Sequence, residues 1–138
     1  MRNWKIKKFG SGNDHLLIIK KPQGINRIIY FLQSYDSIVA CAEHYTGPTQ
    51  TIDSRHYSDG DFISLTLDGR TWDYSKTTAK HRNAFLDRFT PWAVNNTNST
   101  TKRISTGDII LKDLNAPYGV GYFIGHNSSL NNRGVHDE

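Results

Sequence analysis

Hydrophobic and polar residues alternate at the start of the chain. Trp4 and Ile6 fall on one side of a two-residue period, and Lys5 and Lys7 fall on the other. This pattern predicts a half-exposed strand. Lysine on a strand discourages pairing with other chains, so the charge is typical of a sheet edge. We therefore expect an edge strand at the N-terminus.

Short apolar runs separated by turn-forming residues continue along the chain. The predicted strands cover residues 16–19, 25–32, 37–43, 62–67, 109–111 and 120–124. Turns between them contain Ser, Asp, Gly and Pro, which favour tight reversals of the backbone. Such short connections predict a meander of antiparallel strands.

Three polar segments lack a periodic apolar face. Residues 44–61 contain Gly47-Pro48 and Asp59-Gly60, and we expect a long exposed loop there. The Asn/Ser/Thr-rich stretch 95–101 is typical of a surface loop. Residues 127–138 are expected to form a frayed tail.

One segment shows helical periodicity. Ser75 is a favourable N-cap residue and Pro91 ends the pattern, so we predict a helix over residues 75–89. Its apolar arc contains Thr78, Ala79, Phe85, Leu86 and Phe89. Arg82 lies inside this arc, where an unpaired guanidinium would be costly, so its charged end should either extend to solvent or meet an acidic or carbonyl partner.

These elements predict the fold class. A chain of 138 residues fits a single domain, and the pattern is α+β: a mostly antiparallel sheet of five to seven strands with one principal helix packed on one face. The residues expected to be buried are Phe31, Ile38, Val39, Cys41, Leu65, Trp72, Phe85, Leu86 and Phe89.

Composition narrows the class of protein. Hydrophobic residues make up 36% of the chain, too many for a disordered protein, and no apolar run is long enough to span a membrane. Cys41 is the single cysteine, so no intramolecular disulfide can form, and the N-terminus shows no secretory signal. We expect a cytoplasmic protein whose net charge of +4 favours anionic partners.

Two tripeptides offer candidate catalytic residues. His44-Tyr45-Thr46 and His126-Asn127-Ser128 resemble the paired motifs of two-histidine phosphoesterases, in which the imidazoles transfer protons and the hydroxyls hold the phosphate. The residues after Thr46 and Ser128 depart from that family, which continues with an apolar residue. Hydrolysis of cyclic nucleotides or RNA ends is therefore an alternative hypothesis. Our own expectation is that His44 and His126 do not form a catalytic pair.

A metal site is a weaker candidate. Its ligands would come from Glu43, His44, Asp53, His56, Asp59 and Asp61. Mixed histidine and carboxylate ligands suit zinc, but no spacing here matches a known ligand motif. We predict neither a metal nor another cofactor.

Basic residues could form a binding surface. The candidates are Lys5, Lys7, Lys76, Lys80, His81 and Arg88. With Trp4 and Phe9 beside the first two lysines, they would suit a nucleic acid. Lysine on an edge strand or on the outer face of a helix also has the ordinary role of solvation.

Two longer stretches resemble a known family. Residues 30–40 contain Ser34-Tyr35-Asp36-Ser37, and residues 72–86 contain Trp72-Asp73-Tyr74-Ser75 followed by Thr77-Thr78 and a lysine. This pattern is similar to that of small proteins of phages, prophages and plasmids that have no assigned function. The resemblance spans about residues 27–115, with the 44–61 segment as an insertion.

The resemblance implies a mobile-element origin and a site of action in the host cytoplasm. By analogy with counter-defence and host-takeover inhibitors, it implies a non-catalytic protein that binds a host target. We expect a host protein as the partner, with nucleic acid as the alternative and no membrane contact.

Overall fold

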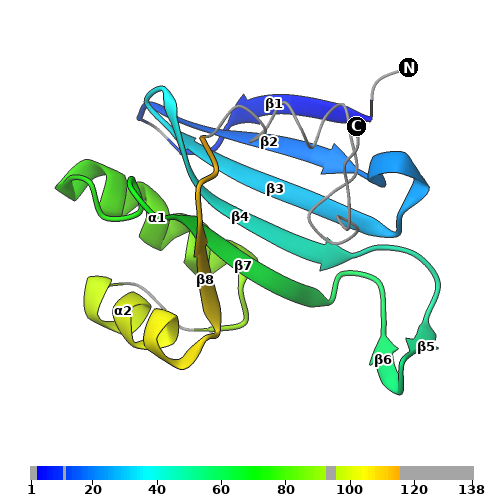
Figure 1. Cartoon of the computed structure of the whole chain (residues 1–138). Helices are drawn as coiled ribbons and strands as arrows, with labels where there is room; N and C mark the ends of the chain where they lie inside the picture. Colours follow the sequence, from blue (N-terminus) through cyan, green and yellow to red (C-terminus); the bar gives the residue numbers. More distant parts are fainter. Residues whose placement is uncertain (1–2, 11, 93–95, 116–138) are drawn as a thin grey trace.

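A six-stranded sheet forms the centre of the computed structural model, which describes residues 3–10, 12–92 and 96–115 (Figure 1). The strands of the sheet are β1 (Trp4–Lys8), β2 (Asp14–Lys20), β3 (Arg27–Ser34), β4 (Ser37–Tyr45), β7 (Phe62–Asp68) and β8 (Ile109–Lys112). They lie in the order β1-β2-β3-β4-β7-β8. Neighbouring strands are antiparallel except β7 and β8, which are parallel.

The sheet confirms the predicted α+β class. β1 lies at one edge, as its lysines indicated, and the connections from β1 to β4 are short apart from a 3-10 turn, η1 (Pro22–Gly24). The predicted strand at 120–124 and the predicted tail at 127–138 lie outside the described residues.

Side-chain alternation gives the sheet two apolar faces. Lys5 pairs with Ile18 and Ile18 with Tyr30, which places these three side chains on one face. The cluster on that face contains Leu16, Ile18, Leu32, Val39, Ala40, Ala42, Leu65, Leu67 and Ile109 together with three side chains of a helix. A second cluster contains Leu17, Ile19, Ile29, Phe31, Cys41 and Leu114.

The predicted helix is confirmed as α1 (Lys76–Phe89). The Ser75 side chain accepts a hydrogen bond from the Thr78 amide, so it caps the helix as expected. Phe85, Leu86 and Phe89 are buried against the sheet. Of the residues expected in the core, Ile38 and Trp72 are half-buried and the others are buried.

A second helix, α2 (Thr97–Thr106), replaces the loop predicted at 95–101. Asn, Ser and Thr are poor helix formers inside a helix, which hid this element. The Asn96 side chain accepts from the Ser99 amide at 2.8 Å, and Gly107 ends the helix with φ of 87°. Thr100 is fully buried and Ile104 packs on the core, so caps and tertiary packing determine this helix.

The segment 44–61 also differs from the predicted exposed loop. It contains the end of β4 and a two-stranded hairpin, β5 (Gln50–Ile52) and β6 (Arg55–Tyr57), which projects beyond the sheet (Figure 1). Asp53 and Ser54 turn the chain with positive φ values of 49° and 66°. Tyr45 is buried and stacks on Tyr57 with ring centroids 5.4 Å apart, which joins the hairpin to the sheet.

We predict that Phe85→Ala lowers the free energy of unfolding by about 3 kcal/mol or more, because it leaves a cavity between α1 and the sheet. Phe85 is fully buried, and its ring lies 4.8 Å from that of Phe89. Urea unfolding measures the change. Tyr74→Ala is the control, since Tyr74 is 78% exposed and should leave stability nearly unchanged. Equal stability of Phe85→Ala and the wild type would refute this packing.

Candidate functional site

His44, the first candidate catalytic residue, has a structural partner. It lies on β4, and its Nε2 is 2.8 Å from the carbonyl oxygen of Phe89 at the end of α1. A carbonyl can only accept, so this nitrogen donates. The imidazole also makes edge contacts with the rings of Tyr30 and Phe62. His44 therefore joins β4 to the C-terminal end of α1.

Thr46, the hydroxyl of the same motif, points to a carboxylate instead of an open cleft. Its Oγ1 donates to Asp59 Oδ1 at 3.0 Å, and the Gly47 amide donates to the same oxygen at 2.9 Å. These two hydrogen bonds lower the pKa of Asp59. The pair closes the base of the hairpin. His126 and Ser128, the second motif, lie outside the described residues.

The carboxylates and histidines considered for a metal do not gather. Within the described residues no group of three or more His, Cys, Asp or Glu side chains is placed to hold a metal ion. Asp59 is committed to Thr46 and Gly47, and His56 Nδ1 lies 3.3 Å from the Thr51 hydroxyl within the hairpin.

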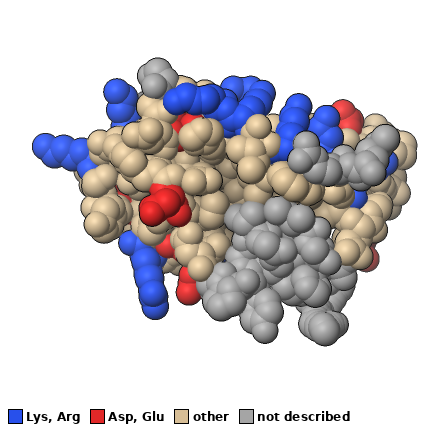
Figure 2. Space-filling view, turned by 90° about the horizontal axis from the view of Figure 1, so that it is seen from above, with Lys and Arg blue, Asp and Glu red and all other residues tan. Residues whose placement is uncertain are grey.

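Lys5, Lys7 and Arg88 lie on one side of the molecule and form what we call the basic face. Lys5 and Lys7 pair with Ile18 and Leu16, whose side chains lie on the α1 side of the sheet. Arg88 comes from the last turn of α1. Figure 2 shows Lys and Arg side chains gathered along one border of the molecule.

Aromatic rings separate these cations. The Arg88 guanidinium lies 5.9 Å from the centroid of the Phe9 ring and 5.3 Å from that of Phe89, distances at which cation–π attraction operates. Tyr30 stacks on Phe89 at 4.4 Å. Burial raises the pKa of Tyr30, and the charge of Arg88 lowers it in part.

The remaining basic candidates are placed differently. Lys76 and Lys80 are exposed on α1, one turn apart. His81 is only 7% exposed and does not belong to this surface. Its Nδ1 lies 2.7 Å from the Ser34 hydroxyl. A Cβ on Gly12 would stand 3.2 Å from its Nε2, so a glycine there lets the β1–β2 turn approach the imidazole.

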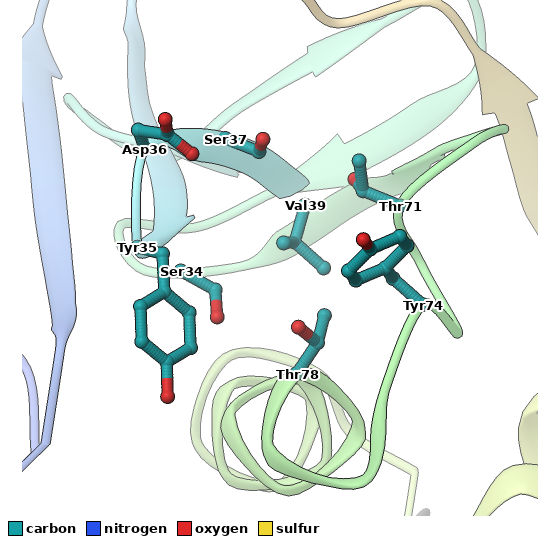
Figure 3. A pocket seen from close by; sticks show the side chains of 8 residues that line it. All are labelled: Ser34, Tyr35, Asp36, Ser37, Val39, Thr71, Tyr74 and Thr78. Carbon is teal, nitrogen blue, oxygen red and sulfur yellow. The ribbon is translucent and has the colours of Figure 1, made fainter.

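Ser34 leads to a pocket that the sequence analysis did not identify (Figure 3). This Tyr35 pocket has a volume of about 320 Å³ and lies between the β3–β4 turn and the beginning of α1. Its lining consists of Ser34, Tyr35, Asp36, Ser37, Val39, Thr71, Tyr74 and Thr78. The Ser-Tyr-Asp-Ser and Trp-Asp-Tyr-Ser stretches, noted only for a family resemblance, meet here.

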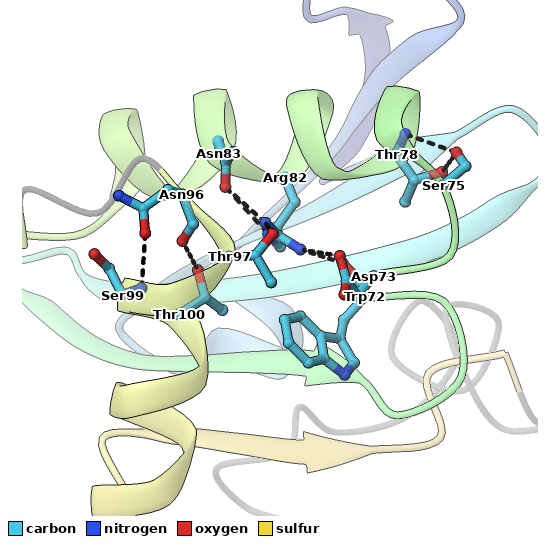
Figure 4. A network of polar contacts seen from close by, with 10 residues as sticks. All are labelled: Trp72, Asp73, Ser75, Thr78, Arg82, Asn83, Asn96, Thr97, Ser99 and Thr100. Carbon is cyan, nitrogen blue, oxygen red and sulfur yellow. Dashed lines mark hydrogen bonds and ion pairs between the residues drawn. The ribbon is translucent and has the colours of Figure 1, made fainter.

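Arg82 holds α1 in the position that forms this pocket (Figure 4). Its side chain is 0% exposed. The guanidinium donates to the Trp72 carbonyl and to the carboxylate of Asp73, and it also donates to the side chains of Asn83 and Thr97. Burial lowers the pKa of Arg82, and Asp73 partly offsets this. Of the two alternatives predicted for Arg82, the structure shows the acidic and carbonyl partners and not a solvent-exposed guanidinium.

The sequence and structure were compared with known proteins. No family model, curated protein or solved structure matches this chain. Among the described residues, no helix is long and apolar enough to cross a membrane.

We predict that Arg82→Lys lowers the free energy of unfolding by about 2 kcal/mol or more, because an ammonium cannot reach the same acceptors as the planar guanidinium. Arg103→Lys is the matched control. Arg103 pairs with Asp108 at the surface, so its replacement should cost under about 1 kcal/mol. Equal melting of the two variants would contradict the role of Arg82.

We predict that His44→Ala reduces stability by about 1 to 2 kcal/mol, because it removes the donor to the Phe89 carbonyl. Purified protein should show no hydrolysis of 2′,3′-cyclic nucleotides, which chromatography of the products tests. Hydrolysis that both His44→Ala and His126→Ala abolish, in variants whose circular dichroism matches the wild type, would establish the phosphoesterase alternative instead.

Proposed function

We propose that this chain is a non-catalytic binding protein of the mobile-element type, which acts by covering an acidic surface of a host protein. The observation that supports the proposal is the basic face. Lys5, Lys7 and Arg88 come from two elements and lie on the same side of one rigid core. Within the described residues none of the three forms an ion pair.

Unpaired cations on a rigid scaffold favour an anionic partner. Their charge steers the approach of that partner and fixes its orientation. Arg88 is pre-organised, because its guanidinium rests over the rings of Phe9 and Phe89. Less side-chain freedom is then lost when Arg88 meets a carboxylate.

The edge position of β1 favours a protein as that partner. Among the described strands β1 pairs only with β2, and an edge strand of this kind can pair with a strand of another protein. Ile6 is 58% exposed and points to the opposite face of the sheet from Lys5 and Lys7, so a strand paired with β1 would also meet an apolar side chain on that face. An acidic strand or loop that pairs with β1 would meet charge, backbone and apolar surface together.

The non-catalytic part of the proposal is supported by three reactive side chains of the described residues, each of which is engaged in the fold. His44 contacts a helix carbonyl and His81 contacts a buried serine. Burial raises the pKa of the Cys41 thiol well above its usual value, and Glu43 raises it further, so the thiol stays protonated. These side chains support the core.

Nucleic acid is the second candidate partner. The basic face also carries aromatic rings, because the Arg88 guanidinium lies over the rings of Phe9 and Phe89 and Tyr30 stacks on Phe89. Aromatic rings among cations are typical of surfaces that bind single strands. Such binding would weaken steeply as salt rises from low to moderate concentration.

We predict that reversing both charges with Lys5→Glu and Lys7→Glu weakens partner binding at least tenfold. Affinity capture from host lysate identifies the partner, and titration of the purified partner measures the dissociation constant. The matched control reverses Lys76 and Lys80, which lie in the first two turns of α1, at the other end of that helix from Arg88, and should change the constant less than threefold.

Equal weakening by the two double variants would refute the basic face as the contact surface. A partner that proves to be DNA or RNA would replace the first candidate by the second.

A further inference from the structure

We propose that the Tyr35 pocket binds the base of a nucleotide, held between the rings of Tyr35 and Tyr74. The site goes beyond the proposed function and does not depend on it. Its lining shares no residue with the basic face. The proposal rests on the size of the pocket, the conformation of Tyr35 and the hydrogen-bonding groups at its floor and rim.

The dimensions of the pocket suit such a ligand. Its volume of about 320 Å³ lies at the small end of the range for ligand sites. Val39 is fully buried and provides an apolar contact at the floor. Figure 3 shows Tyr35 on one side and Tyr74 on the other, with Val39 and Thr78 between them. A flat aromatic ring fits this arrangement better than a branched aliphatic group.

Tyr35 occupies a conformation that its side chain disfavours. Its φ is 57°, in the left-handed region where Gly or Asn is the usual residue of a tight turn. Tyr35 is 51% exposed, and its ring has a tilted contact with the His81 imidazole at 6.2 Å between centroids, so packing offsets only part of this strain. A strained backbone position that presents a large ring to a pocket points to a functional role for that ring.

Tyr74, on the opposite side of the pocket, is also exposed. Its side chain is 78% exposed, although it lies directly before the helix N-cap Ser75. Folding therefore gains little from its ring. Two exposed tyrosine rings at one pocket offer the stacking surfaces that unpaired bases use, and such stacking is sequence-tolerant because every base has a π-face.

The floor and rim supply hydrogen bonds for the edge of a base. Ser34 is 3% exposed and its hydroxyl is held by His81 at 2.7 Å. Within the described part of the chain, Asp36 and Ser37 form no side-chain hydrogen bond, which leaves a carboxylate and a hydroxyl for a ligand. A carboxylate accepts only, so it favours a base with amino or ring N–H donors.

Among the described residues, no Lys, Arg or His lines the pocket. Phosphate would therefore remain outside, and the base would provide recognition. The same chemistry is offered by a free mononucleotide and by one base of a single strand. The experiment below separates these two sources.

The test is isothermal titration calorimetry of the whole protein. The ligands are the four nucleoside 5′-monophosphates and a short single-stranded RNA. We expect saturable binding of at least one monophosphate. Tyr35→Gly should weaken it on the order of 5- to 150-fold, the effect of losing one stacking ring. Glycine suits the positive φ, so this variant should keep or raise the melting temperature.

Gln23→Gly is the matched control. Gln23 has a φ of 56° in the turn η1, which lies at the opposite end of β3 from the pocket, and it does not line the pocket. Its replacement therefore relieves a positive φ without removing a ring from the site. This variant should bind like the wild type. Tyr74→Ala should weaken binding as Tyr35→Gly does.

The outcomes separate the two sources and the two proposals. Monophosphates that bind as tightly as the RNA identify a free nucleotide as the ligand. If the RNA binds much more tightly than the monophosphates, and Lys5→Glu with Lys7→Glu removes this difference in affinity, the ligand is a single-stranded nucleic acid. Those charge reversals should leave monophosphate binding unchanged. Absence of binding to all the nucleotides, or binding that Tyr35→Gly leaves unaltered, would overturn the nucleotide site.

Discussion

A buried guanidinium is the constraint on which the arrangement of the helices depends. Arg82 is completely enclosed, and a charge removed from water is tolerated only when it is paired and its donors are satisfied. Its acceptors come from the segment before α1, from α1 itself and from the start of α2. Displacement of one of these segments would leave buried donors without partners, so the guanidinium opposes it.

This arrangement positions both candidate surfaces. At the N-terminal end of α1, the connection from Trp72 to Ser75 lies against the β3–β4 turn and encloses the Tyr35 pocket. At the C-terminal end, Phe89 packs on Tyr30, its carbonyl accepts from His44, and Arg88 reaches over Phe9. One helix, fixed at both ends, therefore separates a polar pocket from a cationic surface.

The sequence predicted the position of a candidate site residue only where the pattern of its near neighbours determines which face the side chain occupies. The two-residue period of β1 placed Lys5 and Lys7 on one face, and the register with β2 agrees. His81 was expected on the basic surface, and its burial could not be predicted because its partner Ser34 is distant in sequence. The pocket likewise joins residues from β3, β4 and α1 whose meeting is a matter of tertiary packing.

The sequence by itself determined the period-two strands, the edge character of β1 and the extent of α1 with its Ser75 cap, because each follows from contacts between near neighbours. It also showed that a buried Arg82 needs acceptors, because burying an unpaired charge is costly. Only the tertiary structure decided α2, because Thr and Asn become helical there through capping and the burial of Thr100. It also decided the β5–β6 hairpin, where the Tyr45–Tyr57 contact joins a polar segment to the sheet. Long-range burial supplies the free energy that these locally weak segments lack.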